Sequence, residues 1–433
     1  MPNNLPENNL SRNSLKSKRS FWTKIGPGIT TGAADDDPSG IATYSQAGAR
    51  YGFQLLWLSL FTLPLMALVQ EMCARIGMVT GRGLADNIRL HYSRWALYTC
   101  VFLLFVANSF NIGADLGVMA KSLQLLFPNL SFVWMVIIFA VISLLLQVYL
   151  SYGFYAKYLK YLTISLLAYV FVGFIVGIDW SLAFRFTFWP AFNFSKEQIF
   201  LICGILGTTI SPYLFFWQTS QEVEEEILDG KETVIKRRGV SRRDLSAMRW
   251  DIWLGMFFSN LVMFFIIAAC AATLFSSGLT NINSAEQAAL ALQPIAGKWA
   301  FLLFTLGILG TGFLAIPVLA GSAAYAVAES FRWREGLYLK FRQAYSFYFV
   351  IIFSVLIGLV INFLGIDSIQ ALIYSAVLNG LISPIMLFFI VAISGNKKIM
   401  GEWTNRILTR VLGWLTVLIM GLVSFSVLIS LLI

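Results

Sequence analysis

The chain is built from long apolar runs separated by short polar segments. A membrane-spanning helix needs about 20 predominantly apolar residues. Runs of roughly this length recur along the whole chain, at 24–49, 53–79, 95–123, 131–151, 158–178, 197–222, 249–275, 299–328, 344–364, 368–393 and 410–432. The pattern therefore predicts an all-α polytopic membrane protein with about eleven transmembrane helices.

Two of these spans are interrupted near their middle by polar residues and a proline. The first span contains Asp35, Asp36, Asp37, Pro38, Ser39 and Gly40, and the sixth contains Thr208, Thr209, Ser211 and Pro212. Proline removes an amide donor and clashes with the preceding turn, and glycine lowers helix stability. Lipid tolerates a broken helix only where the break is buried in protein or lines a cavity. We therefore expect two helix breaks, at Pro38 and Pro212, enclosed by the other spans.

The two breaks lie five spans apart, which suggests an internal repeat. Interrupted helices at corresponding positions of two halves are typical of inverted-repeat transporters, whose binding site lies near the bilayer midplane. We predict a transporter domain over 21–433 with a 5+5 inverted repeat: repeat one at about 21–180, repeat two at about 197–395, and an additional helix at about 410–432. The alternative is a pair of ordinary proline kinks, but the three carboxylates at the first break favour a transport site.

Composition agrees with a membrane protein. Hydrophobic residues make up 58% of the 433 residues and charged residues only 12%, whereas a soluble domain carries about 25% charged residues. The net charge of +9 does not indicate nucleic-acid binding, because the basic residues lie in short loops between apolar runs. No room remains for a separate soluble domain.

The basic residues also predict the orientation in the membrane. A cytoplasmic N-terminus places 26 of the 31 Lys and Arg residues on the inner side, as the positive-inside rule requires. The other five are Arg50, Lys121, Arg185, Lys196 and Lys298. We expect a multi-pass protein of the cell membrane with an outward-facing C-terminus and a disordered cytoplasmic tail at 1–20.

Residue types that carry catalysis are sparse. The single histidine, His91, lies in the loop after the second span, where we expect it to be solvated. The chain contains no HExxH motif, and no nucleophile stands beside a base. The four cysteines show no metal-binding spacing and are expected to be buried as small hydrophobic side chains: Cys73, Cys100, Cys203 and Cys270. We therefore expect neither an enzyme nor a resident cofactor.

Three motifs resemble a known family. GPG…DPSG…QAGA in the first span, RIGMVTGRGLAD (75–86) and GTTISPYLFFWQTS (207–220) are similar to signatures of NRAMP-type divalent metal transporters. The resemblance extends over the whole layout, and the second motif is its most specific part. It implies an inverted-repeat fold and transport of Mn²⁺ or Fe²⁺, usually together with protons.

The resemblance can be carried over residue by residue. The metal-binding Asp of the family and the Pro after it match Asp37 and Pro38. Gly40 stands at the position of the family's binding-site Asn, and Ser211, followed by Pro212, stands at that of the sixth-span Met. Tyr213 and Gln218 stand at the positions of two histidines linked to proton movement. Ala376 matches a tenth-span Gln, and Ile112 matches one of two third-span acids. The other third-span acid matches Asp115.

The departures predict a changed cation preference. A thioether selects soft or borderline metals, and Ser211 removes it. Oxygen ligands suit hard ions such as Mg²⁺, Ca²⁺ and Mn²⁺. At least one of three neighbouring carboxyls could also carry a proton. The predicted substrate-binding residues are Asp36, Asp37, Ser39, Gly40, Thr209, Ser211 and Tyr213, and the candidates for coupling or gating are Asp35, Glu71, Asp115, Gln218 and Asn379.

Other polar residues within or beside the spans leave more than one interpretation open. Glu71 lies four residues before Arg75, which favours an ion pair, although an inner-gate role is an alternative. Asp115, near Asn108 and Asn111, could serve a proton or ion route or act as a buried strut. Asn379 could line the site or link two helices. The acidic run at 222–226 is expected to form a solvated, salt-bridged loop.

Together these features predict secondary-active transport of a divalent cation by alternating access. The cation, Mg²⁺ or Mn²⁺, would bind between the two breaks, with weakened proton coupling because the histidines are absent. One alternative is transport of a different solute by the same fold. Two further alternatives are a channel or membrane receptor and a membrane-embedded enzyme. The sequence is compatible with a monomer and leaves the oligomeric state open.

Overall fold

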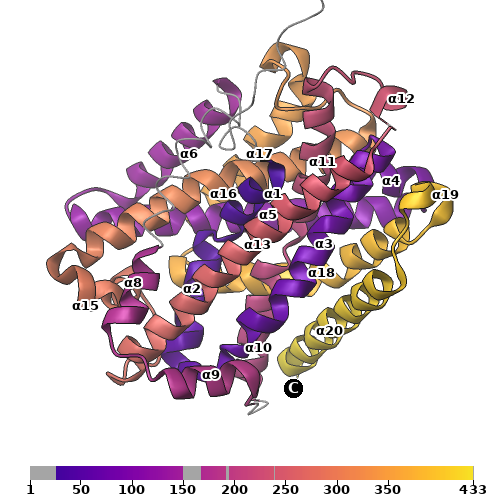
Figure 1. The fold of residues 1–433 in the computed structure, drawn as a ribbon. Helices are drawn as coiled ribbons and strands as arrows, with labels where there is room; N and C mark the ends of the chain where they lie inside the picture. Colours follow the sequence, from indigo (N-terminus) through magenta and orange to yellow (C-terminus); the bar gives the residue numbers. More distant parts are fainter. Residues whose placement is uncertain (1–25, 150–166, 192–194, 238, 433) are drawn as a thin grey trace, which may run out of the picture.

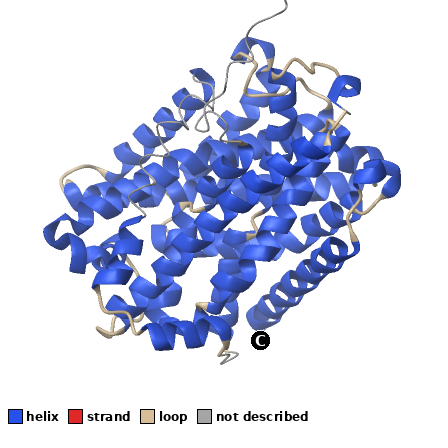
Figure 2. Ribbon diagram, viewed as in Figure 1, coloured by secondary structure: helices blue, strands red, loops and turns tan. Residues whose placement is uncertain are grey.

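The computed structural model describes residues 26–149, 167–191, 195–237 and 239–432, and throughout these ranges the chain consists of helices and their connections (Figures 1 and 2). Within these described ranges, eight segments are long and apolar enough to cross a membrane. They are α3 (Trp57–Thr80), α5 (Arg94–Leu126), α6 (Phe132–Tyr149), α10 (Lys196–Thr209) with α11 (Pro212–Leu228), α13 (Arg242–Cys270) with the π-helix η4 (Ala271–Phe275), α16 (Ala300–Phe331), α18 (Ser368–Ser394) and α20 (Ile407–Leu432).

The other three predicted spans have different outcomes. The first is two short helices, α1 (Pro27–Asp35) and α2 (Pro38–Tyr51), and the ninth is the 17-residue α17 (Tyr345–Ile361). The fifth, at 158–178, lies partly outside the described residues, which begin again with α8 (Leu167–Ile175). The predicted tail at 1–20 also lies outside them. The predicted polytopic all-α architecture is confirmed.

Short helices connect the spans. They are η2 (Gly52–Leu55), α4 (Leu84–His91), α9 (Trp180–Phe188), α12 (Val234–Arg237), α14 (Ala285–Ala289), η5 (Leu290–Leu292), α15 (Gln293–Ala296), η6 (Gly297–Trp299), η7 (Phe341–Gln343), α19 (Lys397–Met400) and η8 (Gly401–Trp403).

The long helices form two packed groups around the interrupted ones. In one group α5 packs along α16 and α17, and α6 packs against α5. In the other, α13 packs against α1, α2 and α3, while α3 also packs against α11. Under the predicted repeat, α11 corresponds to α2 and α3 to α13, so the pairing of α3 with α11 corresponds to that of α13 with α2. These matched pairings agree with an inverted repeat.

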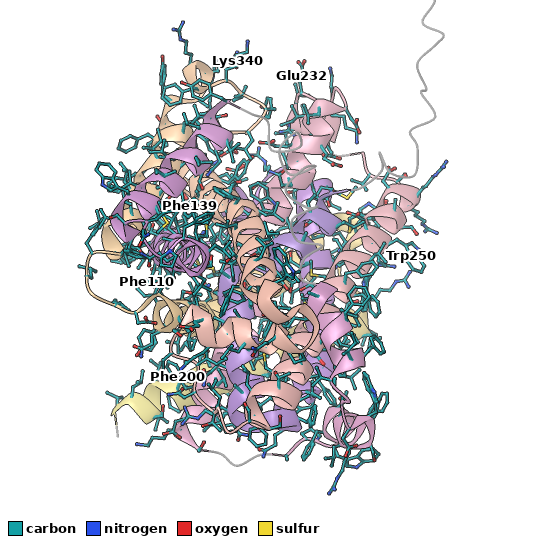
Figure 3. The ribbon with its side chains drawn as sticks, turned by 90° about the vertical axis from the view of Figure 1, so that its left-hand side faces the viewer. Phe110, Phe139, Phe200, Glu232, Trp250 and Lys340 are labelled. Atoms are coloured by element: carbon teal, nitrogen blue, oxygen red, sulfur yellow. The ribbon has the colours of Figure 1, made fainter. Side chains whose placement is uncertain are left out.

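The outer surface is apolar. Trp250 is 76% exposed and projects away from the bundle (Figure 3), and α20 exposes Leu408, Val411 and Leu422. Such a surface is stable in hydrocarbon but not in water. The four cysteines are buried and unpaired, as expected.

The short helices α4, α12 and α19 lie together at one end of the bundle, which we name the basic end. Arg237 donates from Nε to the carbonyl of Gly81 over 3.1 Å, and the guanidinium of Arg75 bonds Asn405. Lys340 and Glu232 lie at this end, whereas Phe200 lies toward the other (Figure 3). His91 is exposed here, as predicted; partial burial and Arg82 lower the pKa of its imidazole.

The prediction of a solvated acidic loop at 222–226 is wrong. These residues extend α11, and Glu222, Glu224 and Glu226 are each at most 7% exposed. Tyr325 and the amide of Leu337 both donate to Glu224. Gln218 of the same helix donates to Glu222, and Lys231 forms an ion pair with Glu226. The carboxylates thus tie the end of the sixth span to the basic end instead of facing solvent.

Helix α1 lies very close to α13 because both carry glycines at the contact. A Cβ built on Gly32 would lie 2.5 Å from the backbone of Gly255, and one on Gly28 would lie 2.6 Å from the amide nitrogen of Ile252. The side chain of Asp251 in α13 also accepts the amide protons of Gly26 (3.1 Å) and Gly28 (2.6 Å), which satisfies the start of α1.

We predict that Gly32→Ala destabilises the protein by about 1–3 kcal/mol, the usual cost of overpacking, and lowers the midpoint of thermal unfolding in detergent. The matched control is Gly421→Ala in α20, where a Cβ meets nothing within 4 Å and alanine favours the helix. Equal midpoints for the two variants would contradict the close contact.

Candidate functional site

The first break lies between α1 and α2. Helix α1 ends at Asp35, Asp36 is its C-cap, and α2 begins at Pro38. Proline suits the first position of a helix because its missing amide proton would have no partner there. Asp37 is the N-cap of α2: its Oδ1 accepts the amide proton of Gly40 (2.8 Å) and the hydroxyl proton of Ser39 (2.6 Å). The predicted break at Pro38 is therefore confirmed as a capped helix start.

The second break has the same form. Helix α10 ends at Thr209 and α11 begins at Pro212. Ser211 is the N-cap of α11 but turns its hydroxyl back to the carbonyls of Gly207 (2.8 Å) and Thr208 (2.5 Å). Thr209 likewise donates to the carbonyl of Ile205 at 2.8 Å. Both hydroxyl oxygens keep lone pairs that could face a ligand.

The two breaks face each other. Tyr213 in α11 donates its phenolic proton to the carbonyl of Ala34 in α1 at 3.1 Å. A Cβ built on Gly40 would lie 2.9 Å from Oγ1 of Thr208, and that oxygen is 3.4 Å from the hydroxyl of Tyr44. The absence of a side chain at Gly40 therefore lets α2 approach the last turn of α10.

Four carboxyl groups gather in this region. Asp35, Asp36, Asp37 and Asp115 are each at most 5% exposed, and Asp115 in α5 lies within electrostatic reach of Asp37. Ser259 in α13 places its hydroxyl 2.6 Å from Asp35 and 3.2 Å from Asp36. Because one hydroxyl has one proton, it cannot satisfy both carboxyl groups at once.

Among the described residues, no basic side chain compensates these carboxyl groups. Across the described residues none of the four carboxyl groups forms an ion pair with Lys, Arg or His. Oδ1 of Asp35 and both carboxyl oxygens of Asp115 have no hydrogen-bond partner. Buried carboxylates are costly unless paired, protonated or bound to a cation. The arrangement therefore favours a positively charged ligand.

A cation here would need more than carboxylates. In the described part of the chain no three Asp, Glu, His or Cys side chains surround a common point. Hydroxyl, amide and freed backbone carbonyl oxygens would have to complete its coordination. Asn111 is well placed for this, because its Nδ2 donates to Oδ2 of Asp37 (2.9 Å) while its own Oδ1 is unpartnered.

Tyr213, a predicted substrate-binding residue, lies within electrostatic reach of Asp35, Asp37 and Asp115, the first and last of which are coupling candidates. Gln218 is farther along α11, where it accepts from Thr31 (2.5 Å) and donates to Glu222 (2.9 Å).

Glu71 and Asn379 are the other two candidates. Glu71 is at the basic end, 3.8 Å from Arg75 as predicted, and it also accepts from Arg249 at 2.8 Å. Asn379 is buried in α18, and its side-chain oxygen has no partner.

Sequence reasoning missed several residues that build the site. Ser259 of α13 reaches Asp35 and Asp36, and Ser383 of α18 donates to the carbonyl of Ile210 in the second break (2.8 Å). Thr31, Tyr44 and Thr208 were also missed as site residues. A single hydroxyl residue in an apolar span does not indicate a binding site in one sequence. Thr208 is an exception, because it lies beside Thr209 at a predicted break.

Comparison with known proteins places this geometry in a family. Residues 28–430 match the family model Nramp, described as natural resistance-associated macrophage protein-like. The chain belongs to the Nramp family. This confirms the resemblance seen in the three motifs.

The curated relatives match this chain over nearly the full length of both proteins, and they are named as transporters, not enzymes. The divalent metal cation transporter MntH of Klebsiella pneumoniae subsp. pneumoniae is 27% identical over 422 residues, which is 95% of this chain and 94% of MntH. The protein of the same name from Yersinia pestis (strain Pestoides F) is 27% identical over 419 residues, or 94% of this chain and 95% of its own.

Solved structures share this fold. A crystal structure of the Eremococcus coleocola manganese transporter, in complex with an aromatic bis-isothiourea substituted compound, superposes with a TM-score of 0.75. It is 20% identical and covers 95% of this chain and 88% of the other. MhsT in complex with L-phenylalanine gives a TM-score of 0.54 at 14% identity, covering 94% of this chain and 97% of MhsT.

We predict that Tyr213→Phe lowers stability by about 1–3 kcal/mol, because the buried carbonyl of Ala34 loses its donor. The control is Tyr374→Phe, since Tyr374 is 47% exposed. Thermal unfolding of both purified variants measures the difference, and an unchanged midpoint for Tyr213→Phe would show that the hydrogen bond between the breaks is not formed.

Proposed function

We propose that this protein carries out secondary-active transport of a divalent metal cation, with the cation bound between the breaks of α1–α2 and α10–α11. The observation that carries the proposal is the set of buried carboxyl groups without a basic partner in the described residues. The names of the relatives support it, since they are a divalent metal cation transporter and a manganese transporter. The cation is cargo and not a cofactor.

The ligands we assign are all oxygens. Asp37 supplies the central carboxylate, and Ser39, Thr209, Ser211 and carbonyls of the two breaks complete the coordination, with Asp36 nearby. Because Gly40 has no side chain, α2 lies close to Thr208, and Tyr213 closes one side of the site. A site of this kind suits Mg²⁺ or Mn²⁺ better than softer metals, because Ser211 stands where a thioether would favour the latter.

Transport then requires alternating access. Asp37 and Ser211 are at most 1% exposed, so the site is closed toward both ends of the bundle. Opening toward the basic end would have to separate α1 from α11, which are linked by Thr31 with Gln218 and by Ala34 with Tyr213. Asp251 and the glycine contacts tie α1 to α13, so these two helices would move together.

Proton coupling is weakened in this proposal. Tyr213 and Gln218 occupy the positions that carry histidines in the resemblance, and neither side chain takes up a proton near neutral pH. The one histidine of the chain, His91, lies at the basic end, away from the site. Asp35 and Asp115 remain as groups that could carry a proton.

The topology completes the proposal. We assign the basic end to the cytoplasm and the C-terminus to the outer side of the cell membrane, since Lys and Arg concentrate in cytoplasmic loops. The two repeats cover about 21–180 and 197–395, and α20 is an additional helix that belongs to neither repeat. The site lies within a single chain, so a monomer suffices for transport.

We predict that Asp37→Asn lowers Mn²⁺ and Mg²⁺ uptake into proteoliposomes by about ten-fold or more, because a charged ligand contributes roughly 1.5–3 kcal/mol. The control is Asp367→Asn at the exposed N-cap of α18, since asparagine also caps helices. Full uptake by Asp37→Asn would remove Asp37 from the site. Wild-type protein that folds but transports neither ion would favour transport of a different solute by the same fold.

A second prediction concerns selectivity. Ser211→Met should raise uptake of Mn²⁺ relative to Mg²⁺ by about ten-fold, since a thioether prefers softer metals. Competition between the two ions in the same proteoliposomes measures the ratio, with Ser211→Ala as the control that removes the hydroxyl without adding sulfur. An unchanged ratio in Ser211→Met would show that position 211 does not contact the cation.

A further inference from the structure

A cavity of about 320 Å³ opens at the basic end between α3, α13 and the start of α20. Four arginines line it together with only two glutamates, Glu71 and Glu402, and with the hydroxyls of Ser246, Thr404 and Thr409. The arginines are Arg75, Arg242, Arg249 and Arg406. The lining therefore carries a net positive charge and several hydrogen-bond donors.

The protein neutralises only part of this charge. Arg249 and Arg75 share Glu71, at 2.8 and 3.8 Å. Neither Arg242 nor Arg406 has a carboxylate partner among the described residues. Arg75 is only 7% exposed, and its Nε is buried without a hydrogen-bond partner. A buried donor of this kind points to a missing acceptor.

A second cavity lies farther along α3 and α20. It has a volume of about 490 Å³ and is lined mainly by apolar side chains of α3, α10 and α20. On α20 its lining begins at Leu412, three residues after Thr409 of the basic cavity, which is about 5 Å along a helix. On α3 its lining begins at Leu65, six residues before Glu71 of the basic cavity. Six residues span about 9 Å along a helix.

We propose that an anionic phospholipid binds along this face, with its phosphate in the basic cavity beside Arg75, Arg242 and Arg406 and an acyl chain in the apolar groove beside α20. Guanidinium groups bind phosphate through paired charge-assisted hydrogen bonds. Basic pockets between transmembrane helices at the cytoplasmic side suit such head groups.

The combination of the two cavities selects a lipid over a soluble anion. A free phosphate would use the arginines but not the groove, which lies among residues that face hydrocarbon, such as Leu415 (41% exposed) and Leu422 (58% exposed). A zwitterionic lipid would fill the groove but leave the net positive charge uncompensated. The bound phosphate would link α13, which packs on α1, to the peripheral α20.

The experiment uses purified full-length protein, depleted of lipid in detergent, and follows the thermal unfolding midpoint during titration. Three additives are compared at equal ionic strength: dioleoylphosphatidylglycerol, dioleoylphosphatidylcholine and inorganic phosphate. The variants are Arg242→Gln/Arg406→Gln in the basic cavity and Leu415→Trp, which fills the groove. The control is Arg334→Gln/Arg342→Gln, which removes the same charge from exposed positions outside the cavity.

Phosphatidylglycerol should raise the midpoint of the wild type and of the control, and the other two additives should not. The concentration needed should rise by about ten-fold or more in Arg242→Gln/Arg406→Gln, as expected for losing charge-assisted hydrogen bonds, and also in Leu415→Trp. Should the double variant fail to fold, Arg406→Gln alone replaces it.

Two results would overturn the proposal. An equal response of all variants to phosphatidylglycerol would show that the lipid acts without this site. An equal effect of inorganic phosphate, unchanged in Leu415→Trp, would show a phosphate site without a lipid chain. Neither result bears on cation transport, because the titration contains no metal.

Discussion

The structure depends on holding four carboxyl groups in its interior without a basic partner among the described residues. Asp35, Asp36, Asp37 and Asp115 lie within the apolar bundle, where an unpaired carboxylate costs several kcal/mol. In the described residues only hydroxyl and amide donors reach them, from Ser39, Ser259 and Asn111 together with the backbone amide of Gly40. The free energy that this arrangement costs can be recovered by a bound cation.

The rest of the fold makes such an interior possible. Two helices must stop and restart inside the membrane, which places Asp37 and Ser211 at helix N-caps and frees backbone carbonyls beside them. The breaks are tolerable only because α13 and α18 cover them closely. Glycines at 28, 32 and 255 bring α13 against α1, and Gly207 brings α10 against α18, where Ser383 satisfies the carbonyl of Ile210.

Sequence reasoning succeeded where the signal is local. Pro38 and Pro212 predict helix starts because each stands in a run of polar residues, and Asp37 lies directly beside the first of them. Proline alone would not have sufficed, since Pro64, Pro317 and Pro384 lie inside continuous helices. It failed where the partner comes from another helix. Ser259 and Ser383 are ordinary residues of apolar spans until packing brings them to the breaks. Glu222 and Glu224 were expected in solvent because an acidic run is usually exposed. They are buried because Gln218 of the same helix donates to Glu222 and the distant Tyr325 donates to Glu224, and composition does not reveal these partners.

The most direct test of the account is anomalous diffraction from crystals of the protein soaked in Mn²⁺, recorded at the manganese absorption edge. The account predicts one strong peak at coordination distance from Asp37, bounded by the α1–α2 and α10–α11 breaks and surrounded by oxygen atoms only. Anomalous peaks confined to carboxylates outside the two breaks, with none beside Asp37, would contradict it.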